Sequence, residues 1–364
     1  MAVKRILQVV PSLNIGSGVT QVVMNLYRNI DREKFQFDFL YFSEMPYTVQ
    51  DEIEKLGGRT YHIPKLSLKN CIGFTKTVFG FLQTHGKEYE AVHLHEVLVG
   101  IILLPLTRKF GIKKRFVHSH NSRPSEKWYK NLRNKLLCMP IKYCATDYLA
   151  CSKLAGEFLY GKEVDFKVVD NGVDVRKYRF NPDVRMEARH RLGLEDEDKV
   201  IGHIGRFCIQ KNQTFLLPVI KELVRRDKTY KFIFIGNGPK YEEFRQLCKK
   251  EGIEEYIRLL GVRNDIPVLL QALDMFVLPS LFEGLPVVGV EAQMAGLPCL
   301  FSDSITAEAK FTSNVRFLSL QAPVEEWCEN ISEMTELQRT DPDELIGSKF
   351  DISTAVKKLE EIYA

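Results

Sequence analysis

Short apolar runs alternate with amphipathic segments along most of the chain. The runs expected to form buried strands are 5–10, 35–42, 60–63, 91–95, 115–117, 199–204, 231–235, 275–278 and 298–301. Between several of them apolar residues recur at helical spacing, as in Val19, Val22, Val23, Leu26 and Ile30. This alternation predicts an α/β fold in which helices cover both faces of parallel sheets.

The length of the chain predicts two domains, because 364 residues exceed what one ordinary hydrophobic core supports. We expect an N-terminal domain over 1–180 and a second over 199–350. The polar, proline-containing segment 177–198 is interpreted as the hinge. The last segment, 351–364, is expected to form an amphipathic helix that can return to the N-terminal domain.

Composition excludes several classes of protein. With 45% hydrophobic and 27% charged residues the chain is typical of soluble globular proteins, and a formal charge of +4 does not indicate nucleic acid. The longest apolar run, 97–106, is too short to cross a bilayer. The eight cysteines include no Cys-x-x-Cys pair, which favours a reducing cytoplasm.

A loop with two glycines, Gly16 and Gly18, follows the first expected strand. A dinucleotide fingerprint needs a third glycine at position 21, where Gln21 stands, so an NAD-dependent oxidoreductase is disfavoured. Two interpretations of the glycines remain open. They let the backbone approach a ligand, or they form a tight turn before a helix.

Two glutamates flank the start of a helix expected near Leu285-Pro286. Glu291 follows Glu283 by eight positions, which on a regular helix places the carboxylates about 12 Å apart on one side. Backbone N–H groups at the helix start favour an anion such as a diphosphate. The arrangement fits a nucleotide sugar, with hydroxyls at both ends and a diphosphate between them. The alternative is that Glu283 caps the helix and Glu291 is solvated.

Two cations follow the strand expected at 199–204. Arg206 can bind a diphosphate by bidentate contact and Lys211 as a point charge, although two surface cations would look the same. Gly236 lies in a turn after the next strand and would let the backbone approach a ligand.

Histidines gather at the expected ends of two strands: His93 and His95 after one, His118 and His120 after the other. Ligands of parallel sheets collect at the carboxyl ends of strands, but buried histidines are also common structural residues. Neither His-x-His pair has a carboxylate set at matching spacing, so no metal site is predicted.

The segment 108–142 contains eleven basic residues and one acidic residue, with apolar and aromatic residues between them. Such a stretch can lie on an anionic membrane surface or attract an acceptor carried on a lipid diphosphate. It can equally be a solvated helix face. A cytoplasmic protein with peripheral contact at the inner face of the membrane is therefore one open expectation.

Three strings resemble the family-four retaining glycosyltransferases, whose fold is called GT-B: EGLPVVGVEAQMAGLP from Glu283, GHIGRFCIQKNQ from Gly202 and RFVHSHNS from Arg115. Bacterial capsule and exopolysaccharide glycosyltransferases are the most similar. The resemblance implies two Rossmann-like domains with parallel sheets facing across a cleft. It implies retaining transfer from a nucleotide diphosphate donor, expected to be a UDP-sugar, to a hydroxyl of a growing glycan, without a metal.

The resemblance also assigns roles to residues. The catalytic set it implies is His120, with His118 in reserve, Arg206, Lys211 and Glu283. The donor-binding set it implies is Gly16, Gly18, Arg206, Lys211, Gly236, Val262, Arg263, Gly284, Leu285, Pro286, Val287 and Glu291. The family usually carries Gly-Gly-x-Glu where this chain has Gly16-Ser17-Gly18-Val19, so only the two glycines are transferred.

Two other functions share the expected fold. A nucleotide-sugar 2-epimerase would act on the donor without an acceptor. A non-catalytic nucleotide-sugar-binding module is disfavoured because both glutamates and both cations are present.

Overall fold

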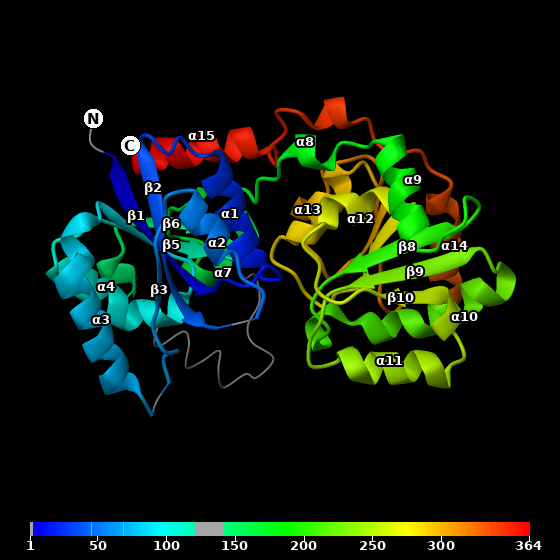
Figure 1. Ribbon diagram of the computed structural model, residues 1–364, viewed down its shortest axis with the longest axis horizontal. Coiled ribbons are helices and arrows are strands. Elements are labelled where there is room, and N and C mark those ends of the chain that lie inside the picture. The colour runs from blue at the N-terminus through cyan, green and yellow to red at the C-terminus, as the bar shows by residue number, and fades with distance from the viewer. Residues whose placement is uncertain (1–2, 45, 68, 121–140) are drawn as a thin grey trace. The chain divides into compact units, whose positions relative to one another are not determined.

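The computed structural model describes residues 3–44, 46–67, 69–120 and 141–364. The chain forms two compact units (Figure 1). Unit 1 comprises Met1–Gly172 and Ile352–Ala364, and unit 2 comprises Val173–Asp351.

Unit 1 is built on a parallel sheet with the strand order β3-β2-β1-β4-β5-β6-β7 in the described residues. The strands are β1 (Lys4–Ser12), β2 (Phe35–Ser43), β3 (Thr60–His62), β4 (Ala91–Leu94), β5 (Lys114–Ser119), β6 (Asp147–Ala150) and β7 (Lys167–Val168). The helices are α1 (Gly18–Asn29), α2 (Gln50–Lys55), α3 (Cys71–His85), η1 (Gly86–Glu88), η2 (Val97–Val99), α4 (Gly100–Lys109), α6 (Ile141–Cys144), α7 (Lys153–Tyr160) and α15 (Ile352–Tyr363).

The two faces of this sheet bury different side chains. Leu7 and Val9 of β1 lie in an apolar core with residues of α3 and α4, such as Phe74 and Leu103. Because side chains alternate along a strand, Gln8 points to the opposite face. There the hydroxyl of Tyr363, on α15, accepts a hydrogen bond from Gln8 Nε2 at 3.1 Å. The C-terminal helix α15 is therefore part of unit 1.

Unit 2 contains a second parallel sheet, in the order β10-β9-β8-β11-β12-β13. Its strands are β8 (Lys199–Ile204), β9 (Tyr230–Ile235), β10 (Ile257–Leu259), β11 (Met275–Leu278), β12 (Cys299–Ser302) and β13 (Val315–Leu318). Its helices are α8 (Val175–Tyr178), α9 (Pro182–Arg191), η3 (Ile209–Lys211), η4 (Gln213–Phe215), α10 (Leu216–Arg226), α11 (Tyr241–Lys250), η5 (Glu254–Tyr256), α12 (Ile266–Ala272), α13 (Val287–Met294), η6 (Ala307–Ala309), α14 (Val324–Thr335) and η7 (Pro342–Leu345).

In each sheet the order of the strands along the chain reverses at a central pair of strands. In unit 1 this pair is β1 and β4, and in unit 2 it is β8 and β11. The crevice outside the carboxyl ends of such a pair is where open α/β sheets bind ligands. We therefore expect ligand sites at the loops after these four strands.

The segment expected to be a hinge, 177–198, is mostly ordered structure of unit 2. The helix α9 begins at Pro182, and the side chain of Asn181 caps it by accepting bonds from Asp183 N and Val184 N. Arg185 and Arg189 bond to Asp274 at 2.6 and 3.3 Å. Because charged side chains rather than an apolar stripe anchor this helix, hydrophobic periodicity could not detect it. The division between the units lies at Gly172 and Val173 instead.

Candidate functional site

An ion pair joins the loops that follow β8 and β11, the central pair of strands in unit 2. Lys211 ends the 3-10 turn η3 after β8, and Glu283 lies in the loop after the neighbouring strand β11. Lys211 Nζ and Glu283 Oε1 are 2.7 Å apart, and their side chains are only 14% and 10% exposed. Partial burial weakens solvent screening, so each charge holds the other in place. The structure therefore brings together two of the predicted site residues.

Three further hydrogen bonds join the loops that carry this pair. Leu281 N donates to Gln210 O at 2.8 Å, and Gln210 Nε2 donates to Phe282 O at 3.0 Å. Asn212 Nδ2 donates to Pro279 O at 3.1 Å. The residues on either side of Lys211 are thus bound to the segment before Glu283, and the ion pair is preorganised.

The structure corrects the helical spacing expected for the two glutamates. Only Val287–Met294 is helical, and its N-cap residue, Pro286, makes no capping hydrogen bond through its side chain. Glu283 lies outside the helix and forms an isolated parallel bridge with Ile305 of the loop after β12. The separation of about 12 Å along one helix face therefore does not apply, because it assumed helical geometry from Glu283 onward. Gly284 and Leu285 lie in the connection between the bridge and the helix.

Glu291 is a buried residue of α13, with 8% of its surface exposed. The hydroxyl of Tyr178, on α8, donates to Glu291 Oε1 at 2.9 Å. The alternative of a solvated glutamate is therefore wrong. Tyr178 was not predicted as a site residue, because no motif or spacing signals a contact between residues so far apart in the chain.

Glycines allow the loops after β8 and β9 to pack backbone against backbone. Gly236 has φ +134°, and a Cβ there would lie 2.1 Å from the carbonyl oxygen of Gly205. A Cβ on Gly238 would lie 2.3 Å from Phe207 O. Phe207 N donates to Asn237 O at 3.1 Å across the same contact. Both glycines are therefore needed for packing, and the approach of a ligand to the backbone at Gly236 stays a prediction.

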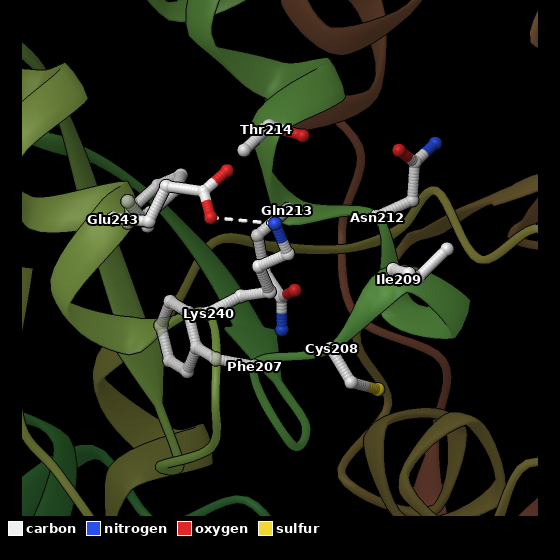
Figure 2. A pocket seen from close by; sticks show the side chains of 9 residues that line it. Phe207, Cys208, Ile209, Asn212, Gln213, Thr214, Lys240 and Glu243 are labelled. Atoms are coloured by element: carbon white, nitrogen blue, oxygen red, sulfur yellow. Dashed lines mark hydrogen bonds and ion pairs between the residues drawn. The ribbon is translucent and has the colours of Figure 1, made fainter.

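A small cavity opens beside these loops (Figure 2). Its volume is about 150 Å³, and it is lined by Phe207, Cys208, Ile209, Asn212, Gln213, Thr214, Lys240, Glu243 and Phe244. Figure 2 shows Lys240 paired with Glu243 at its margin. The cavity does not include Arg206, Lys211 or Glu283 and is smaller than the roughly 300 Å³ of typical ligand sites. It adjoins the candidate site without forming it.

Three more residues predicted to bind the donor, Arg206, Val262 and Arg263, lie in loops after strands of the same sheet. Arg206 follows β8 and is exposed, and its carbonyl accepts from Gln213 Nε2 at 3.0 Å. Val262 and Arg263 follow β10, and the guanidinium of Arg263 bonds to Asp265 at 2.6 Å. Gly261 O accepts from Gly236 N at 2.7 Å. Backbone bonds therefore connect the loops after β8, β9 and β10 in series.

Four histidines in unit 1 form a stacked cluster at the carboxyl ends of β4 and β5. The rings of His93 and His118 are parallel within 8°, and those of His118 and His120 within 18°. Burial lowers the pKa of His93, His95 and His118 well below the ordinary value, and it lowers the pKa of His120 to about 4. The cluster is therefore neutral near pH 7. His120 is partly exposed while His118 is fully buried, which favours His120 as the residue that meets a ligand.

His93, His95 and His118 carry nitrogens within 4.8 Å of one another, a spacing that could accommodate a metal ion. Both nitrogens of His93 and both of His95 are already hydrogen-bonded to neighbouring side chains. A metal would have to displace these bonds. The absence of a metal requirement stays a prediction.

The glycine loop after β1 has a local explanation. Asn14 Oδ1 accepts from Gly16 N at 2.7 Å, and the hydroxyl of Ser17 caps α1, which begins at Gly18. The side chain of Gln21 donates to Ile15 O at 2.7 Å. The residue that replaces the third fingerprint glycine therefore stabilises the loop as a turn.

Most of the basic segment 108–142 lies outside the described residues, as does Asn121 beside His120. Arg115, which is described, donates to the carbonyls of Cys144 and Ile112 at 2.6 Å each, so it has a structural role. Among the helices the structure describes, none is both long and apolar enough for a bilayer.

Comparison with known proteins identifies the family. The model described as "Glycosyl transferases group 1" matches residues 184–344. The chain is 35% identical over 337 residues to EpsF of Bacillus subtilis (strain 168), which is named as a glycosyltransferase. That match covers 90% of this chain and 87% of EpsF. It is 28% identical over 302 residues to the UDP-Gal:alpha-D-GlcNAc-diphosphoundecaprenol alpha-1,3-galactosyltransferase of Escherichia coli, covering 79% of this chain and 76% of that enzyme.

Solved structures agree on the fold. Anabaena Alr3699/HepE in complex with UDP-glucose has a TM-score of 0.81 at 20% identity, covering 99% of both chains. WaaG, a glycosyltransferase of lipopolysaccharide biosynthesis, has a TM-score of 0.69 at 13% identity, covering 98% of this chain and 95% of WaaG. The two parallel sheets have the GT-B architecture expected from the sequence. The chain belongs to the group 1 glycosyltransferases, the family-four enzymes of GT-B fold.

Proposed function

We propose that this protein is a retaining, metal-independent glycosyltransferase of cell-surface polysaccharide synthesis. It transfers a sugar from a UDP-sugar to a hydroxyl of a growing glycan carried on a lipid diphosphate. The observation that carries the proposal is the Lys211–Glu283 pair, held at 2.7 Å where the loops after β8 and β11 meet. Relatives named for UDP-galactose transfer to a diphosphoundecaprenol acceptor, and for capsular polysaccharide synthesis, support the donor and acceptor classes.

The cations would act on the diphosphate. Lys211 has three N–H donors, so it can keep its contact with Glu283 while donating to a phosphate oxygen. Arg206 is exposed and can bind the same group by bidentate contact. Together with the uncapped start of α13, they would stabilise the charge that develops as the diphosphate leaves.

The two glutamates would bind hydroxyls at opposite ends of the donor. Glu283 would accept from the sugar, close to the bond that breaks, and Lys211 keeps its carboxylate oriented. Glu291, fixed by Tyr178, would accept from the ribose. The backbone at Gly236, Val262 and Arg263 would border the base, and Gly284, Leu285, Pro286 and Val287 would border the phosphates.

His120 would act on the sugar. A neutral imidazole accepts a hydroxyl hydrogen or stabilises the positive centre that forms at the sugar. We assign no covalent nucleophile and favour a front-face path, in which the leaving phosphate helps to deprotonate the acceptor. A lipid-linked acceptor would bring the enzyme to the membrane surface, where the basic segment 108–142 would contact anionic lipid.

The test is a donor panel, assayed for UDP release with and without an undecaprenyl-diphosphate-linked sugar and in the presence of EDTA. We expect acceptor-dependent UDP release that EDTA does not abolish, and a product whose anomeric configuration by NMR matches that of the donor. An epimerised sugar formed without acceptor would support the 2-epimerase instead. Donor binding without any reaction would support the non-catalytic module.

A further inference from the structure

Six polar side chains of unit 1 form one hydrogen-bonded network on the sheet face that α15 covers. They are Gln8 of β1, His93 of β4, His95 just after β4, His118 of β5, His120 just after β5, and Tyr363 of α15. Gln8 lies beside His93 in the sheet register, and His93 lies beside Phe116 of β5. The apolar residues that alternate with them, such as Val92 and Val117, line the core on the other face.

The first branch of the network determines which nitrogen of His120 carries hydrogen. Gln8 Oε1 can only accept, so His95 Nε2, 2.9 Å away, must carry a hydrogen. A neutral imidazole has one N–H, so His95 Nδ1 is an acceptor. His120 Nε2, 2.8 Å from it, must then be the donor. His120 Nδ1 is left with a lone pair, and no described residue hydrogen-bonds to it.

The second branch follows from the other end of the same amide. Gln8 Nε2 donates to the Tyr363 hydroxyl at 3.1 Å, so that hydroxyl donates its own hydrogen to His93 Nδ1. His93 Nε2 then carries the hydrogen and donates to His118 Nδ1 at 3.1 Å. His118 Nε2 therefore carries a hydrogen as well, and it is buried without a partner among the described residues.

The two branches are coupled through the Gln8 side chain. If the amide were rotated by 180°, each hydrogen along both branches would move to the opposite nitrogen or oxygen, and His120 Nδ1 would become a donor. The network thus has two self-consistent arrangements, and the direction of one amide selects between them. Among the six side chains only His120 is partly exposed, so it is the member of the network that a ligand can contact.

We infer that Gln8 is a positioning residue that acts through His95 to hold His120 with hydrogen on Nε2, so that Nδ1 accepts a hydroxyl hydrogen from the sugar substrate. This inference rests on the proposed glycosyl transfer for the identity of the ligand. The assignment of the hydrogens follows from the direction of the Gln8 amide in unit 1 and does not depend on the ligand.

The direct test is ¹⁵N NMR of the full chain labelled at histidine nitrogens, near pH 7 and without substrate. We expect His120 and His95 to show Nε2 of the N–H type and Nδ1 of the lone-pair type. The opposite pattern at both residues would overturn the inference. Because this measurement does not involve turnover, it separates a failure here from a failure of the proposed function.

Variants connect the tautomer with catalysis. Gln8→Met removes both amide atoms, and we expect mixed His120 tautomers and a fall in kcat of about tenfold or more, with little change in the donor KM. Gln36→Met is the matched control, since Gln36 is a buried glutamine of β2 that bonds to Tyr27 and Leu56 O outside the network. It should keep the His120 tautomer and kcat. A Gln8→Met enzyme with wild-type kcat would contradict the inference, and the wild-type spectrum decides it if that variant does not fold.

Discussion

Lys211 and Glu283, which follow neighbouring strands of unit 2, form an ion pair of 2.7 Å. Each side chain is mostly shielded from solvent, so removal of one partner leaves the other charge partly buried and unpaired. The pair therefore behaves as one functional unit. Its two members should not contribute independently to catalysis.

A double-mutant cycle tests this interdependence. We expect Lys211→Met and Glu283→Gln each to lower kcat by about 10²–10³, the range for loss of one charge-stabilising group. The double variant should be far less impaired than the product of the two single effects. Glu243→Gln is the control, because Glu243 pairs with Lys240 beside the neighbouring cavity. Strictly multiplicative losses would contradict the interdependence of the pair.

Tyr178 is expected to act on donor binding. Because its hydroxyl donates to Glu291, Tyr178→Phe should raise the donor KM by roughly tenfold or more while kcat changes little, as expected for loss of a bond to a charged group. Steady-state kinetics with varied donor measures this. Tyr230→Phe is the matched control, because its hydroxyl bonds to Ser332 elsewhere in unit 2. A Tyr178→Phe enzyme with wild-type KM would show that Glu291 needs no such support.

The packed loops after β8 and β9 should not tolerate a methyl group. Gly238→Ala places a Cβ 2.3 Å from Phe207 O, so the loop must shift. We expect a loss of about 1–3 kcal/mol in the free energy of unfolding and weaker binding of UDP. Gly73→Ala is the control, because a Cβ there meets nothing within 4 Å. Thermal unfolding and UDP titration of both variants check this, and equal stability of the two would contradict the packing argument.

The histidine cluster predicts how stability depends on pH. Burial lowers the pKa of His118 well below the ordinary value and that of His120 to about 4, whereas an unfolded histidine titrates near 6.5. The unfolded chain therefore binds more protons below about pH 6.5. The free energy of unfolding should have its full value above that pH and should fall as the pH drops toward 4.

Urea unfolding at several pH values, followed by circular dichroism, measures this slope. His118→Gln should make it shallower by up to about 1.4 kcal/mol per pH unit, the contribution of one proton. Tyr160→Phe is the control, since it removes a buried hydroxyl that bonds to Val117 O and Leu149 O but does not titrate in this range. A His118→Gln protein with the wild-type slope would show that His118 can take up a proton when folded.

Sequence patterns predicted the parts of the structure that depend on local periodicity or on short motifs. Buried strands and the helix 352–363 were found because their apolar residues recur at the period of the element. Lys211 and Glu283 were found because each lies in a recognisable string. The strings could not show that the two side chains contact each other.

The features that were missed depend on contacts between distant segments. The helix α9 is anchored by charges to Asp274, and Glu291 is buried under Tyr178. The histidine network depends on Tyr363 at the far end of the chain. One signal was available for it: polar residues occupy alternate positions of three strands that otherwise read as buried, which indicates a polar layer on one face.

We propose that the loops of unit 2 that carry Lys211 and Glu283 bind the diphosphate of a UDP-sugar without a metal. Isothermal titration of UDP into the protein in EDTA tests it most directly. We predict saturable one-site binding to the wild type, weakened at least about tenfold in Lys211→Met and unchanged in Lys240→Met, whose lysine pairs with Glu243 at the neighbouring cavity. Equal affinity of the wild type and Lys211→Met, or binding that requires a divalent ion, would rule out metal-free binding of the diphosphate by Lys211.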